Sequence, residues 1–119
     1  MRKDNQVVLK SKAFAIRIIR LDKYLTGEKK EYVLSKQVLR SGTSIGANIR
    51  ESIRAQNTAD FLSKMQIALK EADETEYWLE LLTETDYITE EAGKSLLDDC
   101  EELIKLIVSI VKTTKDKQE

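Results

Sequence analysis

The sequence predicts an all-α protein, an up-down-up-down antiparallel four-helix bundle formed by one domain over residues 1–119. The chain has no proline and only four glycines, so it offers few positions at which a helix must stop. Hydrophobic residues make up 41% and charged residues 34% of the chain, which is too apolar for a disordered protein. Apolar residues also recur at the three- and four-residue spacing of a helix face along the chain.

The first two helices follow from this spacing. The first is expected from about Asn5 to Leu25, and Gly27 is expected as its C-terminal cap. Its buried face should consist of Val7, Ser11, Phe14, Ile18, Leu21 and Leu25. The second helix is expected from about Glu31 to Ala55. Its apolar stripe should consist of Leu34, Val38, Ser41, Ile45, Ile49 and Ile53.

The other two helices carry clearer start signals. The third is expected from about Thr58 to Glu84, with Asn57 as its N-cap. The fourth is expected to follow an N-cap at Thr89 and to run to about Lys112. Its stripe should consist of Leu96, Leu97, Cys100, Leu103, Ile104, Ile107, Val108 and Val111. Because the connections are only a few residues long, neighbouring helices must run antiparallel.

Composition also limits the function. The chain has no histidine, which removes the commonest general base, most zinc sites and the helical ribonucleases that use an arginine and a histidine. One cysteine cannot form an internal disulfide, and the start of the chain lacks the apolar run of a signal peptide. We therefore expect a cytoplasmic protein that is not an enzyme, with no catalytic residues, no metal, no cofactor and no membrane association.

The stretch RSGTSIGANIRES, Arg40 to Ser52, is unusual for the middle of a helix. A glycine in a helix costs about 1 kcal/mol relative to alanine, so two of them suggest a compensating contact. Gly42 and Gly46 lie along one edge of the apolar face, and Ser44 and Asn48 lie along the other. These four residues are predicted to pack against a helix of the same bundle or of another subunit. The Asn48 amide either bonds across such an interface or satisfies a local backbone group.

Charge is divided between the two halves of the chain. Residues 1–54 carry 13 Lys and Arg against 5 Asp and Glu, a net charge of +8, whereas residues 55–119 carry 7 against 16, a net charge of −9. A basic half is typical of a polyanion-binding protein. The candidate nucleic-acid-binding residues form a stripe on the second helix: Lys36, Arg40, Arg50 and Arg54.

The second helix also carries a family resemblance. EYVLSKQVLRSGTSIGANIRES resembles the signature of the 23S rRNA intervening-sequence protein family, also called the four-helix bundle protein family. The matching positions are Glu31, Tyr32, Leu34, Ser35, Gln37, Arg40, Ser41, Ser44, Ile45, Asn48, Ile49 and Glu51. FLSKMQIALKEADETEYWLELL is similar to the family's third helix. The chain departs from the pattern in having Ser52 where glycine is usual, and in lacking a proline in the first turn.

The resemblance implies an up-down bundle that assembles as a homopentamer and has no established catalytic activity. Similar proteins are accessory factors of diversity-generating retroelements, where they bind nucleic acid and a reverse transcriptase. The resemblance therefore implies RNA or DNA, and a protein partner, as candidate ligands.

Two alternatives to nucleic-acid binding remain open at this stage. In the first, the basic and acidic halves attract each other and the protein is an assembly or adaptor module without nucleic acid. In the second, the protein resembles a MazG-like, magnesium-dependent nucleotide pyrophosphohydrolase. That reaction would need Glu71 and Glu74 on one helix to face Asp98 and Glu101 on the next, because carboxylates suit a hard cation.

Overall fold

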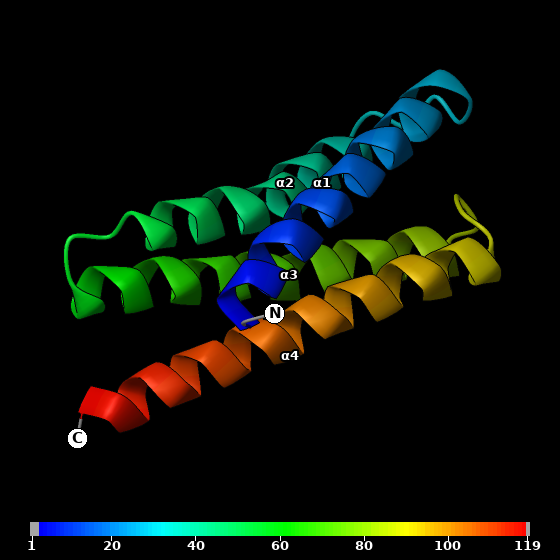
Figure 1. Cartoon of the computed structure of the whole chain (residues 1–119). Coiled ribbons are helices and arrows are strands. Elements are labelled where there is room, and N and C mark those ends of the chain that lie inside the picture. Colours follow the sequence, from blue (N-terminus) through cyan, green and yellow to red (C-terminus); the bar gives the residue numbers. More distant parts are fainter. Residues whose placement is uncertain (1–2, 119) are drawn as a thin grey trace.

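The computed structural model describes residues 3–118 and contains four helices (Figure 1). They are α1 (Lys3–Gly27), α2 (Leu34–Ile53), α3 (Thr58–Glu84) and α4 (Glu90–Gln118). Each helix packs against its two neighbours, and the bundle measures 49 × 22 × 22 Å. The predicted all-α four-helix bundle is therefore confirmed.

The core is built from the stripes that the spacing predicts, with two exceptions. All six residues predicted for the inner face of α1 are buried, and Met65, Leu79 and Leu103 are among the fully buried side chains of the other helices. Ile53 and Val108 were also expected in the core but are 52% and 47% exposed. Ile53 is the last residue of α2, and Val108 follows the fully buried Ile107, so neither is covered by a neighbouring helix.

The ends of the helices show which turn predictions hold. Asn57 accepts a hydrogen bond from the Asp60 N–H at 2.8 Å, and the Thr89 hydroxyl accepts one from the Ala92 N–H at 3.1 Å, so both N-caps are confirmed. The Gly27 cap is wrong, because no described glycine has a positive φ. The left-handed residue after α1 is Lys30, with φ 54°.

Glu31 begins the second helix in an unexpected way. It was expected inside the helix, but α2 starts at Leu34 and the Glu31 carboxylate folds over its first turn. That carboxylate accepts hydrogen bonds from the N–H groups of Val33, Leu34 and Ser35 at 3.1, 3.0 and 2.7 Å. Burial raises the pKa of Glu31, but the backbone hydrogen bonds outweigh it and the pKa lies below its ordinary value. One side chain thus satisfies three of the N–H groups that a helix start leaves unpaired.

The two glycines of α2 face α1. A Cβ atom on Gly42 would lie 2.8 Å from Cγ1 and 2.9 Å from Cγ2 of Ile18, which is fully buried. A Cβ atom on Gly46 would lie 3.4 Å from the carbonyl oxygen of Ser11, an ordinary contact. The close approach of α1 to α2 therefore requires glycine at residue 42 and only favours a small residue at residue 46.

We expect Gly42→Ala to destabilise the protein and Gly46→Ala to leave it unchanged or more stable. The clash with Ile18 should cost about 1–3 kcal/mol, offset by a gain of about 1 kcal/mol in helix propensity. Urea unfolding followed by circular dichroism measures both changes. Ile18→Ala removes the clashing atoms, so the Gly42→Ala and Ile18→Ala double variant should lose less than the sum of the single variants. Equal stability of the two glycine variants would contradict this geometry.

We expect Glu31→Gln to lower the free energy of unfolding by about 1 kcal/mol at neutral pH, the usual contribution of a helix cap. Because the pKa of Glu31 is lower in the folded than in the unfolded protein, its stabilisation is complete above the unfolded pKa and disappears as pH falls through the folded pKa. The free energies of unfolding of the unsubstituted protein and of Glu31→Gln, measured by urea titration at a series of pH values, should become equal in acid. If the difference in free energy of unfolding between the two proteins stayed constant to below the folded pKa of Glu31, its charge would contribute nothing to stability.

Candidate nucleic-acid interface

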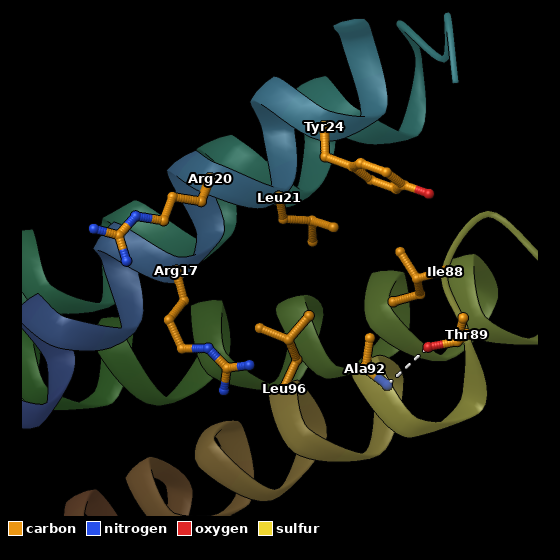
Figure 2. A pocket seen from close by; sticks show the side chains of 8 residues that line it. All are labelled: Arg17, Arg20, Leu21, Tyr24, Ile88, Thr89, Ala92 and Leu96. Carbon is orange, nitrogen blue, oxygen red and sulfur yellow. Dashed lines mark hydrogen bonds between the residues drawn. The ribbon is translucent and has the colours of Figure 1, made fainter. Parts of the chain in front are cut away.

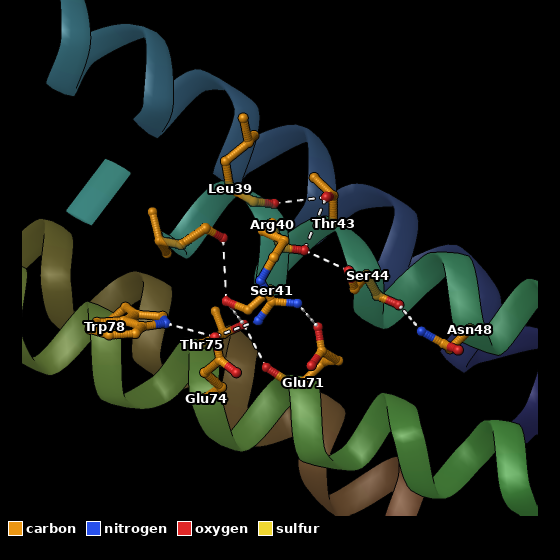
Figure 3. Close-up of polar contacts among 11 residues, drawn as sticks. Leu39, Arg40, Ser41, Thr43, Ser44, Asn48, Glu71, Glu74, Thr75 and Trp78 are labelled. Atoms are coloured by element: carbon orange, nitrogen blue, oxygen red, sulfur yellow. Dashed lines mark hydrogen bonds and ion pairs between the residues drawn. The ribbon is translucent and has the colours of Figure 1, made fainter. Parts of the chain in front are cut away.

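Arg40 lies between α2 and α3 and is held by two carboxylates of α3 (Figure 3). One guanidinium nitrogen donates to Glu71 at 2.7 Å, and another donates to Glu74. Glu74 also accepts from the indole N–H of Trp78 at 3.0 Å. Hydrogen bonds from Trp78 and Arg40 lower the pKa of Glu74, and the two glutamates raise that of Arg40. Of the four predicted nucleic-acid-binding residues, Arg40 thus already has anionic partners.

A buried polar contact lies beside this ion pair. The hydroxyl oxygens of Ser41 and Thr75 are 2.9 Å apart, and Thr75 also lies 2.7 Å from the carbonyl oxygen of Glu71. Both side chains are fully buried, so water cannot replace these bonds. Together with Arg40, this contact fixes the register of α2 against α3.

Ser44 and Asn48 continue along the same side of α2 but bond to their own helix. The Ser44 hydroxyl donates to the Arg40 carbonyl at 2.6 Å, and the Asn48 amide nitrogen donates to the Ser44 carbonyl at 2.9 Å. Both side chains are half-buried. The Asn48 amide nitrogen therefore has the local backbone partner that was one of its two expected roles.

The opposite side of α2 forms a shallow groove with α1. The groove has a volume of ≈ 260 Å³, and small residues such as Ala15, Gly46 and Ala47 lie along it. Lys12 of α1 and Arg50 of α2 line the same groove. Lys12 was not singled out from the sequence, because only the packing of α1 on α2 brings it next to Arg50.

Lys36, Arg50 and Arg54 are exposed, and none of them forms an ion pair with another residue in the described part of the chain. Lys36 and Arg54 are separated by about 27 Å along the helix, at 1.5 Å per residue. The three side chains therefore do not converge on one small anion. Their spacing suits an extended chain of negative charges.

The carboxylates of the alternative magnesium site are not brought together. Glu71 and Glu74 bind Arg40, whereas Asp98 pairs with Lys94 in its own helix at 2.9 Å. Glu101 faces Glu76, and burial together with that neighbour raises the pKa of Glu76. No group of three or more possible metal ligands occurs among residues 3–118.

Cys100 is also unsuited to chemistry. Its thiol is buried and donates to the Ala72 carbonyl at 3.3 Å. Burial raises the pKa of Cys100 to about 12, so the nucleophilic thiolate is scarce at neutral pH. Within the described residues, no helix is both long enough and apolar enough to cross a bilayer.

These features define a class, namely a four-helix-bundle protein with a basic surface on α1 and α2. The model of the family described as 23S rRNA-intervening sequence protein matches residues 3–109, and the chain belongs to that family. It is similar to a solved structure from Bacteroides thetaiotaomicron, a protein of unknown function from the S23 ribosomal protein family. The two are 60% identical with a TM-score of 0.92, over 93% of this chain and 99% of the other. A search of curated proteins found no match.

We expect Arg40→Gln to lower the free energy of unfolding by up to about 1 kcal/mol, the upper range for a partly exposed ion pair. The change leaves Glu71, whose side chain is 16% exposed, without its cation. Unfolding is measured in urea through the fluorescence of Trp78, the only tryptophan. Arg50→Gln is the matched control and should change stability by less than about 0.5 kcal/mol. Equal effects of the two substitutions would mean that the Arg40 ion pairs contribute no stability.

Proposed function

We propose that this protein is a non-catalytic homo-oligomer that binds RNA or another nucleic acid through the basic surface of α1 and α2. The residues proposed to contact phosphates are Lys36, Arg50 and Arg54, joined by Lys12. Arg40 is assigned a different role, because a phosphate would have to displace Glu71 and Glu74 to reach it.

One observation carries the proposal. The cations that lie between helices are paired with carboxylates, as in Lys10 with Glu102 and Arg17 with Asp99. Arg50 and Arg54 instead project from the surface of α2 with no carboxylate partner among the described residues. Unpaired arginines in a row are suited to phosphate oxygens, which their guanidinium groups bind with two parallel hydrogen bonds.

The mode of binding follows from the aromatic residues. Tyr32 is 61% exposed and Tyr24 is 42% exposed, and both lie near the Lys36 end of the surface, away from Arg50 and Arg54. Reading bases in single strands needs aromatic rings on which the bases stack. We therefore infer contact with the phosphate backbone and little sequence preference.

Oligomerisation is part of the same proposal. Leu9 and Ile16 on the outer face of α1 are 55% and 41% exposed, and a second copy would remove them from water. The family resemblance favours a pentamer, and we propose that it acts in the cytoplasm. Light scattering that finds only monomer at micromolar concentration would contradict this part.

We expect RNA affinity to fall steeply with salt. For single strands, the slope of log affinity against log salt is about −0.7 for each phosphate contact. Replacing Arg50 and Arg54 with glutamine should reduce this slope by roughly 1–1.5 per subunit engaged, with little loss of stability. Fluorescence anisotropy of a labelled single-stranded RNA over a salt series measures the slope.

The matched control removes the same charge elsewhere, by Lys112→Gln with Lys115→Gln at the end of α4, and should leave the slope unchanged. The oligomer should also survive the arginine substitutions. If the Arg50 and Arg54 variant kept full RNA affinity but dissociated into monomers, those arginines would pair with a neighbouring subunit. The protein would then be an assembly or adaptor module that recruits a protein partner.

A further inference from the structure

A second cavity lies on the other side of α1, between its C-terminal half and the first turns of α4 (Figure 2). Its volume is ≈ 440 Å³, within the range of about 300–1,000 Å³ that is usual for small-molecule sites. Figure 1 shows the ribbons of α1 and α4 separating toward this end of the bundle. The cavity shares no lining residue with the groove between α1 and α2.

The floor of the cavity is apolar. The side chains of three apolar residues point toward one another across it: Leu21 of α1, Ile88 just before α4, and Leu96 of α4. Each of them is less than 10% exposed. The ring of Tyr24 lies at one end, where it is 42% exposed. Such a floor favours the apolar body of a ligand over water, because burying apolar surface contributes about 25 cal/mol per Å².

The polar side chains that line the cavity are mainly cationic. Arg17 and Arg20 line it at the end opposite Tyr24, and no carboxylate lines it. Arg17 is held in place because it donates to Asp99 at 2.7 Å and to the Ser95 hydroxyl at 3.1 Å. These bonds leave other N–H groups of its guanidinium available, since an arginine has five.

Arg20 adds a charge that nothing in the described part of the chain neutralises. It is exposed and forms no ion pair with a described residue. A fixed arginine and a free arginine beside an apolar floor are complementary to a molecule that is apolar at one end and anionic at the other.

We propose that the cavity between α1 and α4 binds a small amphipathic organic anion. Its apolar or aromatic body lies on Leu21, Ile88 and Leu96, and its carboxylate, sulfonate or phosphate group lies at Arg17 and Arg20. This site is separate from the proposed nucleic-acid surface and does not depend on it.

Two fluorescent probes test the proposal. The first is 1-anilinonaphthalene-8-sulfonate, an aromatic anion, and the second is N-phenyl-1-naphthylamine, which has the same rings without the sulfonate. The full chain should bind the anionic probe more tightly than the neutral one. Arg20→Gln should raise the dissociation constant of the anionic probe about tenfold and leave that of the neutral probe unchanged, because only the charge is lost.

Ala92→Phe tests the location. Ala92 lines the cavity at an exposed position of α4, so a larger side chain there should fill the space without disturbing the core. Both probes should then lose binding, and circular dichroism should confirm an intact fold. The matched control is Lys112→Gln, which removes a cation from a different apolar cavity of ≈ 290 Å³ between α3 and α4 and should change neither probe.

Three outcomes would overturn the proposal. In the first, Arg20→Gln and Ala92→Phe bind the anionic probe as the unsubstituted chain does. In the second, the loss of binding follows Lys112→Gln, which would place the probe between α3 and α4. In the third, the unsubstituted chain binds neither probe and Ala92→Phe changes the mass measured by light scattering, which would make the cavity an interface with a second copy.

Discussion

The contact between Ile18 and Gly42 is the constraint on which the rest of the structure depends. Because residue 42 has no side chain, the branched side chain of Ile18 reaches the backbone of α2. This contact brings α1 against α2 along the small residues around Gly46 and places Lys12 beside Arg50. The basic surface therefore follows from packing as much as from charge. Without the close approach, Lys12 of α1 and Arg50 of α2 would not line one groove.

The charge asymmetry of the chain is used mostly between helices. Lys10 and Arg17 of α1 pair with α4, and Arg40 of α2 pairs with α3, so acids of the second half meet cations of the first. Partly exposed pairs of this kind contribute at most about 1 kcal/mol each. Their larger effect is to select one arrangement of the four helices, because other arrangements would place like charges opposite each other. The cations left over, such as Arg20 and Arg50, are those available to ligands.

The fold could be predicted from the sequence further than the candidate site could. Helix faces and the caps at Asn57 and Thr89 follow from local patterns, which a single helix contains in full. Arg40 illustrates the limit. It belongs to a regular basic stripe, yet its long side chain reaches sideways to Glu71 and Glu74, and only the neighbouring helix decides that. Glu31 is similar. The sequence pattern predicts a helix that includes Glu31, but its carboxylate instead accepts hydrogen bonds from the N–H groups at the start of α2.

The cavity between α1 and α4 had no sequence signal at all. Leu21 and Leu96 read as ordinary core residues, and the space between them exists because α1 follows α2 away from α4. The same close packing that assembles the basic surface on one side of α1 thus opens a space on its other side. Lys12 and Ala15 face α2, whereas Arg17 and Leu21 face α4, so the body of α1 separates the two proposed anion-binding regions. An anion bound at Arg20 and a polyanion bound at Arg50 would therefore influence each other only through a shift of α1. Gly42 and Ile18 resist that shift, because any rotation of α1 about their contact moves a fully buried side chain.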